Sequence, residues 1–272
     1  MDPITARGMK MPKLGLGTWR LKGPECADAV EQALDLGYRH IDTAEMYGNE
    51  DAVGDALART SVPRADIHLT TKVWWDHLAP TAMAKAIEDS LTRLQTEYVD
   101  LYLIHWPAPE MDMAQVIDSL VRVQDSGKAR AIGVANFTTA LLHQALALGA
   151  PIACNQVEYH VLLAQDRLLA AQHTASIPLV AYAPLAQGRL AEHDALRDIA
   201  AKHAATPAQI ALKWLLDQDG VAAIPKASRH VTQQANLDSL AITLDDADRA
   251  AIAALPKDSR FVQPAFAPTW DR

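Results

Sequence analysis

Residues 99–105 read VDLYLIH. The run is almost continuously apolar, which is typical of a strand in a parallel sheet that is covered on both faces. Runs of the same kind recur along the chain at 14–18 (LGLGT), 38–42 (YRHID), 67–72 (IHLTTK), 131–134 (AIGV), 152–156 (IACNQ), 179–182 (LVAY) and 221–225 (VAAIP). Amphipathic stretches of helical length separate the eight runs, and this alternation indicates repeated βα units.

Helix signals lie between the runs. We predict one helix over 25–36, ended by Gly37, and another over 81–94 behind Pro80. The clearest start is Thr206, which can cap a helix whose first turn holds a proline and whose Gln209 can return to the cap amide.

Eight βα units without a linker predict an α/β fold with one closed (β/α)8 TIM barrel, a single domain over residues 1–272. An amphipathic segment at 245–255 and a tail that ends in Trp270 remain outside these units. We expect the C-terminal tail to lie over the barrel mouth.

The charge balance argues against nucleic acid or a membrane as the partner. The chain has 25 Lys and Arg against 33 Asp and Glu, a formal charge of −8. Its first ten residues lack the apolar core of a secretory signal, and no run of about 20 apolar residues occurs. Cys26 and Cys154 lie far apart and are expected to be core residues in a reducing compartment. These features predict a cytoplasmic protein that binds a small molecule. We expect a monomer, although none of these features decides the oligomeric state.

Polar side chains end most of the predicted strands, where barrel enzymes carry their chemistry. The residues are Asp42, Lys72, His105, Asn136, Gln156 and Tyr182. The first four are spaced by 30, 33 and 31 residues, about one βα unit each, so the side chains should surround one mouth. Taken singly, each has a structural explanation, such as an ion pair, a core histidine or a packing tyrosine. Their coincidence favours a functional site.

The chemistry of these groups fits together. Tyr47 is a further titratable group that we expect at the same mouth. A lysine ammonium beside it should lower the pKa of the phenol, so that it can donate a proton. Asp42 can hold and balance Lys72, and a neutral His105 can donate a hydrogen bond to a substrate oxygen. Such a site polarises a carbonyl.

Several other chemistries lack their motifs. No G-x-S-x-G turn is present, the ten histidines show no zinc spacing, and no P-loop occurs. A lone G-x-G at Gly15 and Gly17 is followed by Arg20 where a Rossmann fingerprint needs its third glycine. We therefore expect no metal. Two alternatives stay open: a Schiff-base lyase or aldolase that uses Lys72, and a nucleotide-sensing barrel without useful catalysis.

Six separated motifs, in order, resemble the aldo-keto reductases. They are GYRHIDTAEMYGNEDAVG at 37–54, TKVWW at 71–75, LIHWP at 103–107, GVANF at 133–137, NQVEYH at 155–160 and IPKASR at 224–229. The likeness covers positions 11–271 and is nearest to the bacterial branch that reduces 2,5-diketo-D-gluconate and methylglyoxal.

The resemblance implies a (β/α)8 barrel that transfers hydride from NADPH to small aldehydes, α-oxoaldehydes or keto sugar acids. Asp42, Tyr47, Lys72 and His105 match the family's catalytic positions, with Tyr47 as the proton donor. The positions that match the cofactor contacts are Asn136, Gln156, Tyr182, Leu185, Lys226, Ser228, Arg229 and Asn236.

The pattern departs from the family at the cofactor contacts. The usual serine before Asn136 is Ala135, and Thr232 and Ala235 replace an arginine and a glutamate near the adenosine. Lys226 and Arg229 remain as two cations for the 2′-phosphate that distinguishes NADP from NAD, so we still expect NADPH.

Tryptophans follow several predicted strand ends. Trp19, Trp74 and Trp106 match family pocket positions, and Trp75 stands beside them. We expect them to form an aromatic substrate wall that excludes water.

Overall fold

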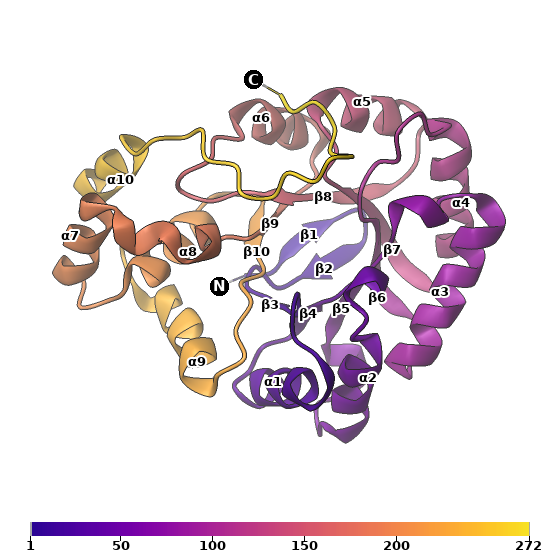
Figure 1. Cartoon of the computed structure of the whole chain (residues 1–272), viewed down its shortest axis with the longest axis horizontal. Helices are drawn as coiled ribbons and strands as arrows, with labels where there is room; N and C mark the ends of the chain where they lie inside the picture. Colours follow the sequence, from indigo (N-terminus) through magenta and orange to yellow (C-terminus); the bar gives the residue numbers. More distant parts are fainter. Residues whose placement is uncertain (1, 272) are drawn as a thin grey trace.

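The computed structural model describes residues 2–271 and holds an eight-stranded parallel sheet that curls on itself (Figure 1). The order around the sheet follows the sequence, so each strand pairs with its neighbour along the chain. The strands are β3 (Leu16–Gly17), β4 (His40–Asp42), β5 (His68–Val73), β6 (Val99–Ile104), β7 (Ala129–Ala135), β8 (Ile152–Glu158), β9 (Leu179–Tyr182) and β10 (Val221–Ala223). The predicted barrel fold is thereby confirmed.

Backbone hydrogen bonds between the first and last strands close the sheet into a barrel. The amides of Gly15 and Gly17 donate to the carbonyl oxygens of Ala223 and Pro225, at 2.9 and 3.1 Å. A Cβ on Gly17 would lie 2.6 Å from the carbonyl oxygen of Ile224. Only glycine therefore permits this close approach of the two strands.

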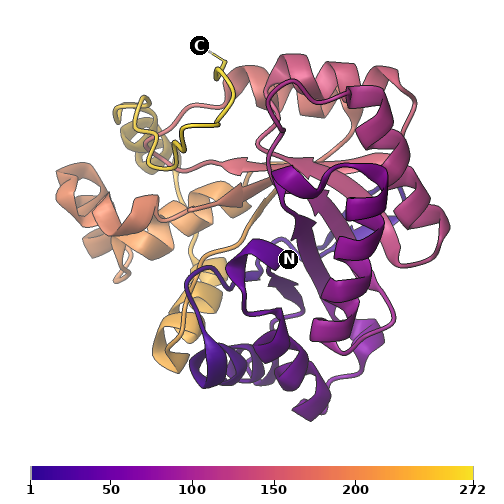
Figure 2. The same cartoon turned by 45° about the vertical axis from the view of Figure 1, so that its right-hand side comes forward.

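Helices form the outer layer (Figures 1 and 2). They are α1 (Gly23–Asp35), α2 (Glu50–Arg59), α3 (Pro80–Leu94), α4 (Met113–Asp125), α5 (Thr139–Ala147), α6 (Asp166–Ala175), α7 (Asp194–Lys202), α8 (Pro207–Leu216), α9 (His230–Asp238) and α10 (Asp246–Ala253). None of the helices in residues 2–271 is long and apolar enough to cross a membrane.

Two apolar layers explain why the strands are almost continuously hydrophobic. Along β6, Leu101 and Leu103 belong to a cluster inside the barrel, whereas Tyr102 and Ile104 belong to the larger cluster between sheet and helices. Successive side chains point to opposite faces of a strand, so both faces must be apolar.

The helix signals in the sequence correspond to observed helix ends. The helix predicted over 25–36 begins two residues earlier, at Gly23, and ends before Gly37, whose φ of 101° suits glycine. Thr206 accepts from the amide of Gln209, and the Gln209 side chain accepts in return from the cap amide. This is the predicted capping box.

An N-terminal hairpin, absent from the sequence prediction, closes the floor of the barrel. Its strands β1 (Ile4–Ala6) and β2 (Met9–Met11) pair antiparallel around Arg7 and Gly8, which both have positive φ. Met9 and Met11 pack into the inner cluster. Alternating apolar residues around an Arg-Gly pair were the signal that could have revealed it.

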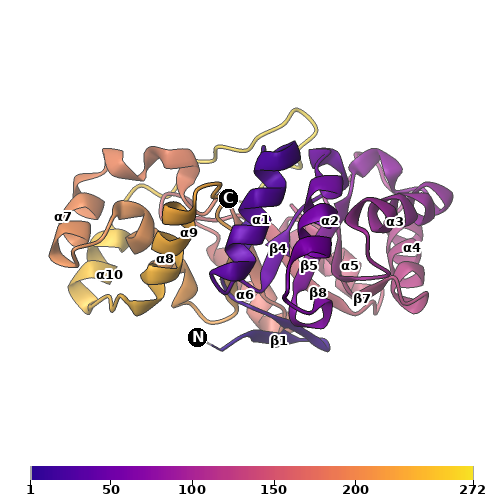
Figure 3. The ribbon, with the colours of Figure 1, turned by 90° about the horizontal axis from the view of Figure 1, so that it is seen from below.

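The C-terminal tail crosses the other end of the barrel, opposite the hairpin (Figure 3). The buried carboxylate of Glu158, at the end of β8, accepts from the amides of Phe261 and Val262 at 2.7 and 3.0 Å. At the far end, Asp271 accepts from the amide and hydroxyl of Thr139, both at 2.8 Å. The expected tail over the mouth is therefore present and is anchored at two points.

A buried histidine pair near the floor predicts loss of stability in acid. His40 and His68 meet edge to face, with ring centroids 4.8 Å apart, and both are buried. Burial lowers the pKa of His40 and holds the pKa of His68 well below 6.5. The unfolded chain therefore binds more protons below pH 6.5, so the free energy of unfolding falls as the pH drops, by at most about 1.4 kcal/mol per pH unit for each histidine.

Urea unfolding of wild type and His68→Phe at pH 7 and pH 5 measures this effect. We expect a smaller loss between the two pH values in the variant, whereas the exposed His143→Phe should behave like wild type. An equal loss in all three proteins would contradict the assignment.

Candidate active site

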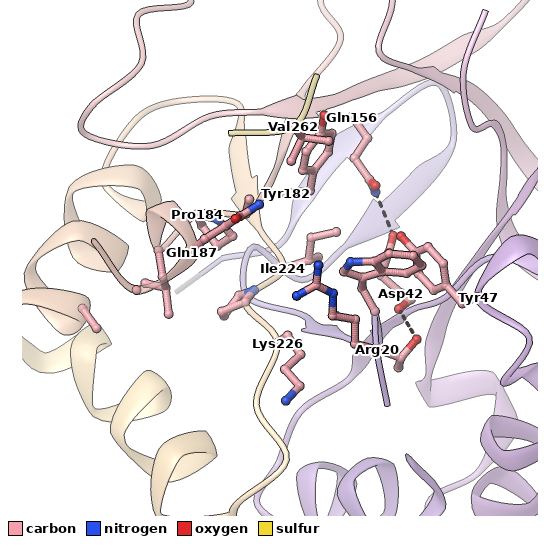
Figure 4. A pocket seen from close by; sticks show the side chains of 18 of the residues that line it. Arg20, Asp42, Tyr47, Gln156, Tyr182, Pro184, Gln187, Ile224, Lys226 and Val262 are labelled. Carbon is pink, nitrogen blue, oxygen red and sulfur yellow. Dashed lines mark hydrogen bonds between the residues drawn. The ribbon is translucent and has the colours of Figure 1, made fainter. Parts of the chain in front are cut away.

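A cavity of about 790 Å³ opens at the carboxyl ends of the strands, where the sequence places its polar residues. Of the predicted residues, Asp42, Tyr47, His105, Asn136, Gln156 and Tyr182 line it, together with Trp19, Trp106, Leu185 and Lys226. Figure 4 shows several of these side chains converging from separate strands. A volume of this size is typical of cofactor and ligand sites.

Lys72 is the centre of the polar cluster below the cavity. Its side chain is fully buried, and its Nζ donates to Asp42 Oδ1 at 2.5 Å and to the carbonyl oxygen of Thr43 at 2.8 Å. The third contact is Tyr47 Oη at 3.4 Å. These three acceptors use the three protons of the ammonium group.

A short turn after β4 brings Tyr47 to this position. Residues Glu45–Tyr47 form a 3₁₀ turn that ends at Gly48, whose φ is 57°. The buried side chain of Asn49 donates to the carbonyl oxygens of Thr18 and Leu21, both at 3.0 Å. Asn49 thus ties the turn to the loop after β3 and fixes the place of the phenol.

Burial and the charge of Asp42 act together on the pKa of Tyr47 but in opposite directions on the pKa of Lys72. Burial raises the pKa of Tyr47 well above 10, and the nearby Asp42 carboxylate raises it further. Burial also lowers the pKa of Lys72, although Asp42 partly opposes this. The sequence-based expectation of a lowered phenol pKa is wrong for this state, because Asp42 offsets the lysine charge and the site is shielded from water. Tyr47 therefore keeps its proton.

His105 is a neutral imidazole in this site. Burial holds its pKa well below 6.5, and the charge of Lys72 acts in the same direction. Its Nδ1 is buried without a hydrogen-bond partner in the described chain, while the ring lines the cavity. A neutral imidazole has one N–H, and only Nε2 can find an acceptor, so we assign the proton to Nε2.

Three side chains from β7, β8 and β9 form a polar wall of the cavity. Asn136 donates to the carbonyl oxygen of His105 at 2.9 Å and accepts from Tyr182 Oη at 2.7 Å. Gln156 donates from Nε2 to Asp42 Oδ2 at 2.7 Å. The wall is therefore bonded directly to the cluster of Asp42 and Lys72.

The other predicted cofactor residues are spread over the loop and helix after β10. Lys226 is exposed, lines the cavity and has no ion pair within residues 2–271. Arg229 is exposed at the start of α9, beside the half-buried Ser228, whereas Asn236 is buried in that helix. Neither Ser228, Arg229 nor Asn236 lines the cavity.

Two of the four tryptophans line the cavity, and the other two pack beside it. Trp19 is 44% exposed and lies 4.8 Å from the Tyr47 ring, while Trp106 is buried and lines the cavity. Trp74 packs against the His105 ring at 5.1 Å but does not line the cavity. Trp74, Trp75 and Trp106 each lie within 5.6 Å of the ring of Phe266.

Sequence reasoning missed residues that reach the site from loops. Phe266 comes from the tail, and no motif predicts that it inserts among the tryptophans. Arg20 lines the cavity and has no ion pair in the described part of the chain (Figure 4). Its φ of 69° lies in the region that glycine prefers, at the position where the Rossmann fingerprint would have a glycine. A cation after a strand end was the available signal.

Comparison with known proteins identifies the family of the chain. Residues 13–257 match the model of the Aldo/keto reductase family. The chain belongs to that family. It is therefore an enzyme, a carbonyl reductase, and the resemblance seen in the sequence is confirmed.

Curated relatives and a solved structure match more than nine-tenths of the chain. It is 40% identical over 268 residues to methylglyoxal reductase DkgB of Escherichia coli O157:H7, covering 97% of this chain and 100% of that protein. Methylglyoxal reductase DkgA of Escherichia coli K12 is 39% identical, covering 93% and 92%. A crystal structure provisionally named 2,5-diketo-D-gluconic acid reductase B superposes with a TM-score of 0.97 at 39% identity, covering 100% of this chain and 98% of that one.

Proposed function

We propose that this aldo/keto reductase reduces small aldehydes, α-oxoaldehydes such as methylglyoxal, or keto sugar acids such as 2,5-diketo-D-gluconate, with NADPH as the hydride donor and Tyr47 as the proton donor. The observation that carries the proposal is the contact of Tyr47 with Lys72 below a cavity that His105 also lines. The names of the relatives supply the substrate classes.

The cavity suits a nicotinamide cofactor. When bound, NADPH supplies the hydride that the protein itself lacks. The ring of Tyr182 and the amides of Asn136 and Gln156 are the groups for its nicotinamide end. Arg20 and Lys226, which have no ion pair within residues 2–271, suit its phosphates, as does the start of α8, whose residues 206–208 line the same cavity.

Tyr47 can act as the acid because its proton is held until a substrate oxygen becomes negative. Its raised pKa keeps the phenol neutral in the resting site. When the proton leaves, the phenolate forms 3.4 Å from the ammonium of Lys72, which stabilises the new charge. Lys72 therefore acts on the charge formed during reaction rather than on the resting pKa.

His105 orients the carbonyl. With its proton on Nε2, the neutral ring can donate one hydrogen bond into the cavity, to the same oxygen that Tyr47 protonates. Trp19, beside the Tyr47 ring, and Trp106 add apolar surface to the cavity, and Trp270 of the tail packs against Trp106. Such walls fit a small carbonyl compound and exclude water.

A Schiff base on Lys72 is less compatible with these contacts. All three protons of Nζ have acceptors, and the side chain is fully buried beneath Tyr47. A nucleophilic amine must be neutral and free to reach a carbonyl carbon. Borohydride trapping with methylglyoxal in the absence of nicotinamide should therefore leave Lys72 unmodified.

Two cations should set the preference for NADPH over NADH. We expect the double variant Lys226→Ala with Arg229→Ala to raise KM for NADPH about 10- to 100-fold and to change KM for NADH little, because only NADPH carries the 2′-phosphate. Initial rates with each cofactor measure both constants. A matched double variant of exposed cations on the outer helices, Lys85→Ala with Arg122→Ala, serves as the control. Equal rises for both cofactors would contradict the phosphate assignment.

The substrate is best found with a panel. Methylglyoxal, 2,5-diketo-D-gluconate and aromatic aldehydes, each with NADPH and with NADH, distinguish the proposed classes by kcat/KM. Absence of carbonyl-dependent oxidation of NADPH across the panel would contradict the proposed function.

A further inference from the structure

Gln156 belongs to the polar wall of the cavity and also contacts the cluster of Asp42 and Lys72. Gln156 is 2% exposed, and its Nε2 donates to Asp42 Oδ2 at 2.7 Å (Figure 4). Its Oε1 makes no hydrogen bond within residues 2–271 and is not among their buried unpartnered atoms. Since Gln156 lines the cavity, Oε1 is open to it.

Asp42 fixes this orientation of the amide. An ionised carboxylate only accepts hydrogen bonds, so the NH₂ group must face Asp42 and the oxygen must face the cavity. The opposite orientation would place two oxygens without a proton at hydrogen-bonding distance inside a buried site, which is costly. The cavity therefore presents an acceptor that can receive an N–H from a ligand amide.

The same bond completes the partners of Asp42. One carboxylate oxygen accepts from Lys72 Nζ at 2.5 Å and the other accepts from Gln156. The strands involved, β4 and β8, lie four places apart in the ring of eight, so the bond spans the barrel. A continuous series of contacts thus runs from the cavity through Gln156, Asp42 and Lys72 to Tyr47.

We propose that Gln156 is a positioning residue that couples the nicotinamide-binding wall of the cavity to the proton donor, because it holds Asp42 in the orientation that places Lys72 under Tyr47. This inference rests on the proposed function, and it adds to Gln156 a role in the chemical step. Without the amide, one carboxylate oxygen loses its partner, and the Asp42–Lys72 pair can shift away from the phenol.

Two substitutions at Gln156 separate this role from a packing role. At saturating NADPH, Gln156→Leu should lower kcat about 10- to 100-fold, the range expected when a hydrogen bond to a charged group is lost. Gln156→Glu keeps the shape, and when protonated it can still donate to Asp42. Its kcat should be near that of wild type at low pH and should fall as the pH rises and the introduced carboxyl group ionises beside Asp42.

A measurement without cofactor tests the same contact. In folded Gln156→Glu, the charge of Asp42 should raise the pKa of the introduced carboxyl group above its unfolded value. The stability of this variant is therefore retained at low pH and lost as the pH rises through that raised pKa. Thermal unfolding of the cofactor-free variant from pH 5 to pH 9 should show this loss. In the double variant Gln156→Glu with Asp42→Asn, the loss should be smaller and should end at a lower pH, because the neighbouring charge no longer raises the folded-state pKa of the introduced carboxyl group.

Gln172→Glu is the matched control. Gln172 is also 2% exposed and donates to the carbonyl oxygen of Pro178, outside the mouth. This variant can lose stability on ionisation, but its kcat should show no new pH dependence while it stays folded.

The outcomes distinguish the two proposals. A wild-type protein without reductase activity overturns the proposed function, while the cofactor-free unfolding curves still test the contact between Gln156 and Asp42. A kcat of Gln156→Glu that follows wild type at every pH, or an unfolding curve unaffected by Asp42→Asn, overturns the positioning role.

Discussion

Tyr47→Phe should lower kcat by about 100- to 10,000-fold, the usual contribution of a general acid, while NADPH still binds. The phenol is the hydroxyl that contacts Lys72 at the cavity, and phenylalanine removes the proton without removing the ring. The ring contacts with Trp19 and His105, at 4.8 and 5.5 Å, should persist. Rates with methylglyoxal and cofactor binding by NADPH fluorescence measure the two effects separately.

Tyr102→Phe is the matched control for this variant. Tyr102 is also on the barrel, but it is buried between sheet and helices, and its hydroxyl has no partner within residues 2–271. Removal of this hydroxyl should leave kcat unchanged. Near-normal turnover by Tyr47→Phe would end the assignment of Tyr47 as the proton donor.

Lys72→Met should destabilise the fold by about 3–5 kcal/mol, because it leaves the buried carboxylate of Asp42 without its cation. Addition of Asp42→Asn should recover a large part of this loss, since the uncompensated charge is then gone. Urea unfolding of the two single variants and the double variant gives the coupling free energy. Both proteins that carry Lys72→Met should also lose turnover, because no cation remains beside Tyr47.

The exposed pair of Lys85 and Asp89 provides the comparison. Lys85→Met makes the same change at the surface, where an ion pair contributes at most about 1 kcal/mol. A Lys72→Met protein as stable as Lys85→Met would show that Lys72 and Asp42 are not coupled in the way that their 2.5 Å contact indicates.

The barrel was predictable because its strands are covered on both faces. VDLYLIH needs apolar residues on both sides of β6, so the run stands out without an alignment. The hairpin at 4–11 is harder to predict because its strands have three residues each, so the alternation of apolar residues around Arg7 and Gly8 is a weak signal. The polar strand ends could be found because one βα unit separates them and every unit repeats the same geometry.

The electrostatics of the site could not be predicted in the same way. Lysine beside tyrosine suggested a lowered phenol pKa, but the sign depends on how deeply Tyr47 lies and on how closely Asp42 approaches Lys72. The depth of Tyr47 and the distance from Asp42 to Lys72 both depend on how segments far apart in the chain pack together. The insertion of Phe266 among the tryptophans is of the same kind.

The barrel and the polar residues that end its strands could be found from the sequence, because the period of apolar runs and the spacing of polar strand ends are local properties of the chain. The family followed from the resemblance of its motifs. The three-dimensional structure was needed to show that the pKa of Tyr47 is raised rather than lowered, that Glu158 anchors the tail over the mouth and that Gln156 bonds across the barrel to Asp42. These features depend on distances of a few ångströms and on exclusion of water, which arise only when the ring of strands has closed.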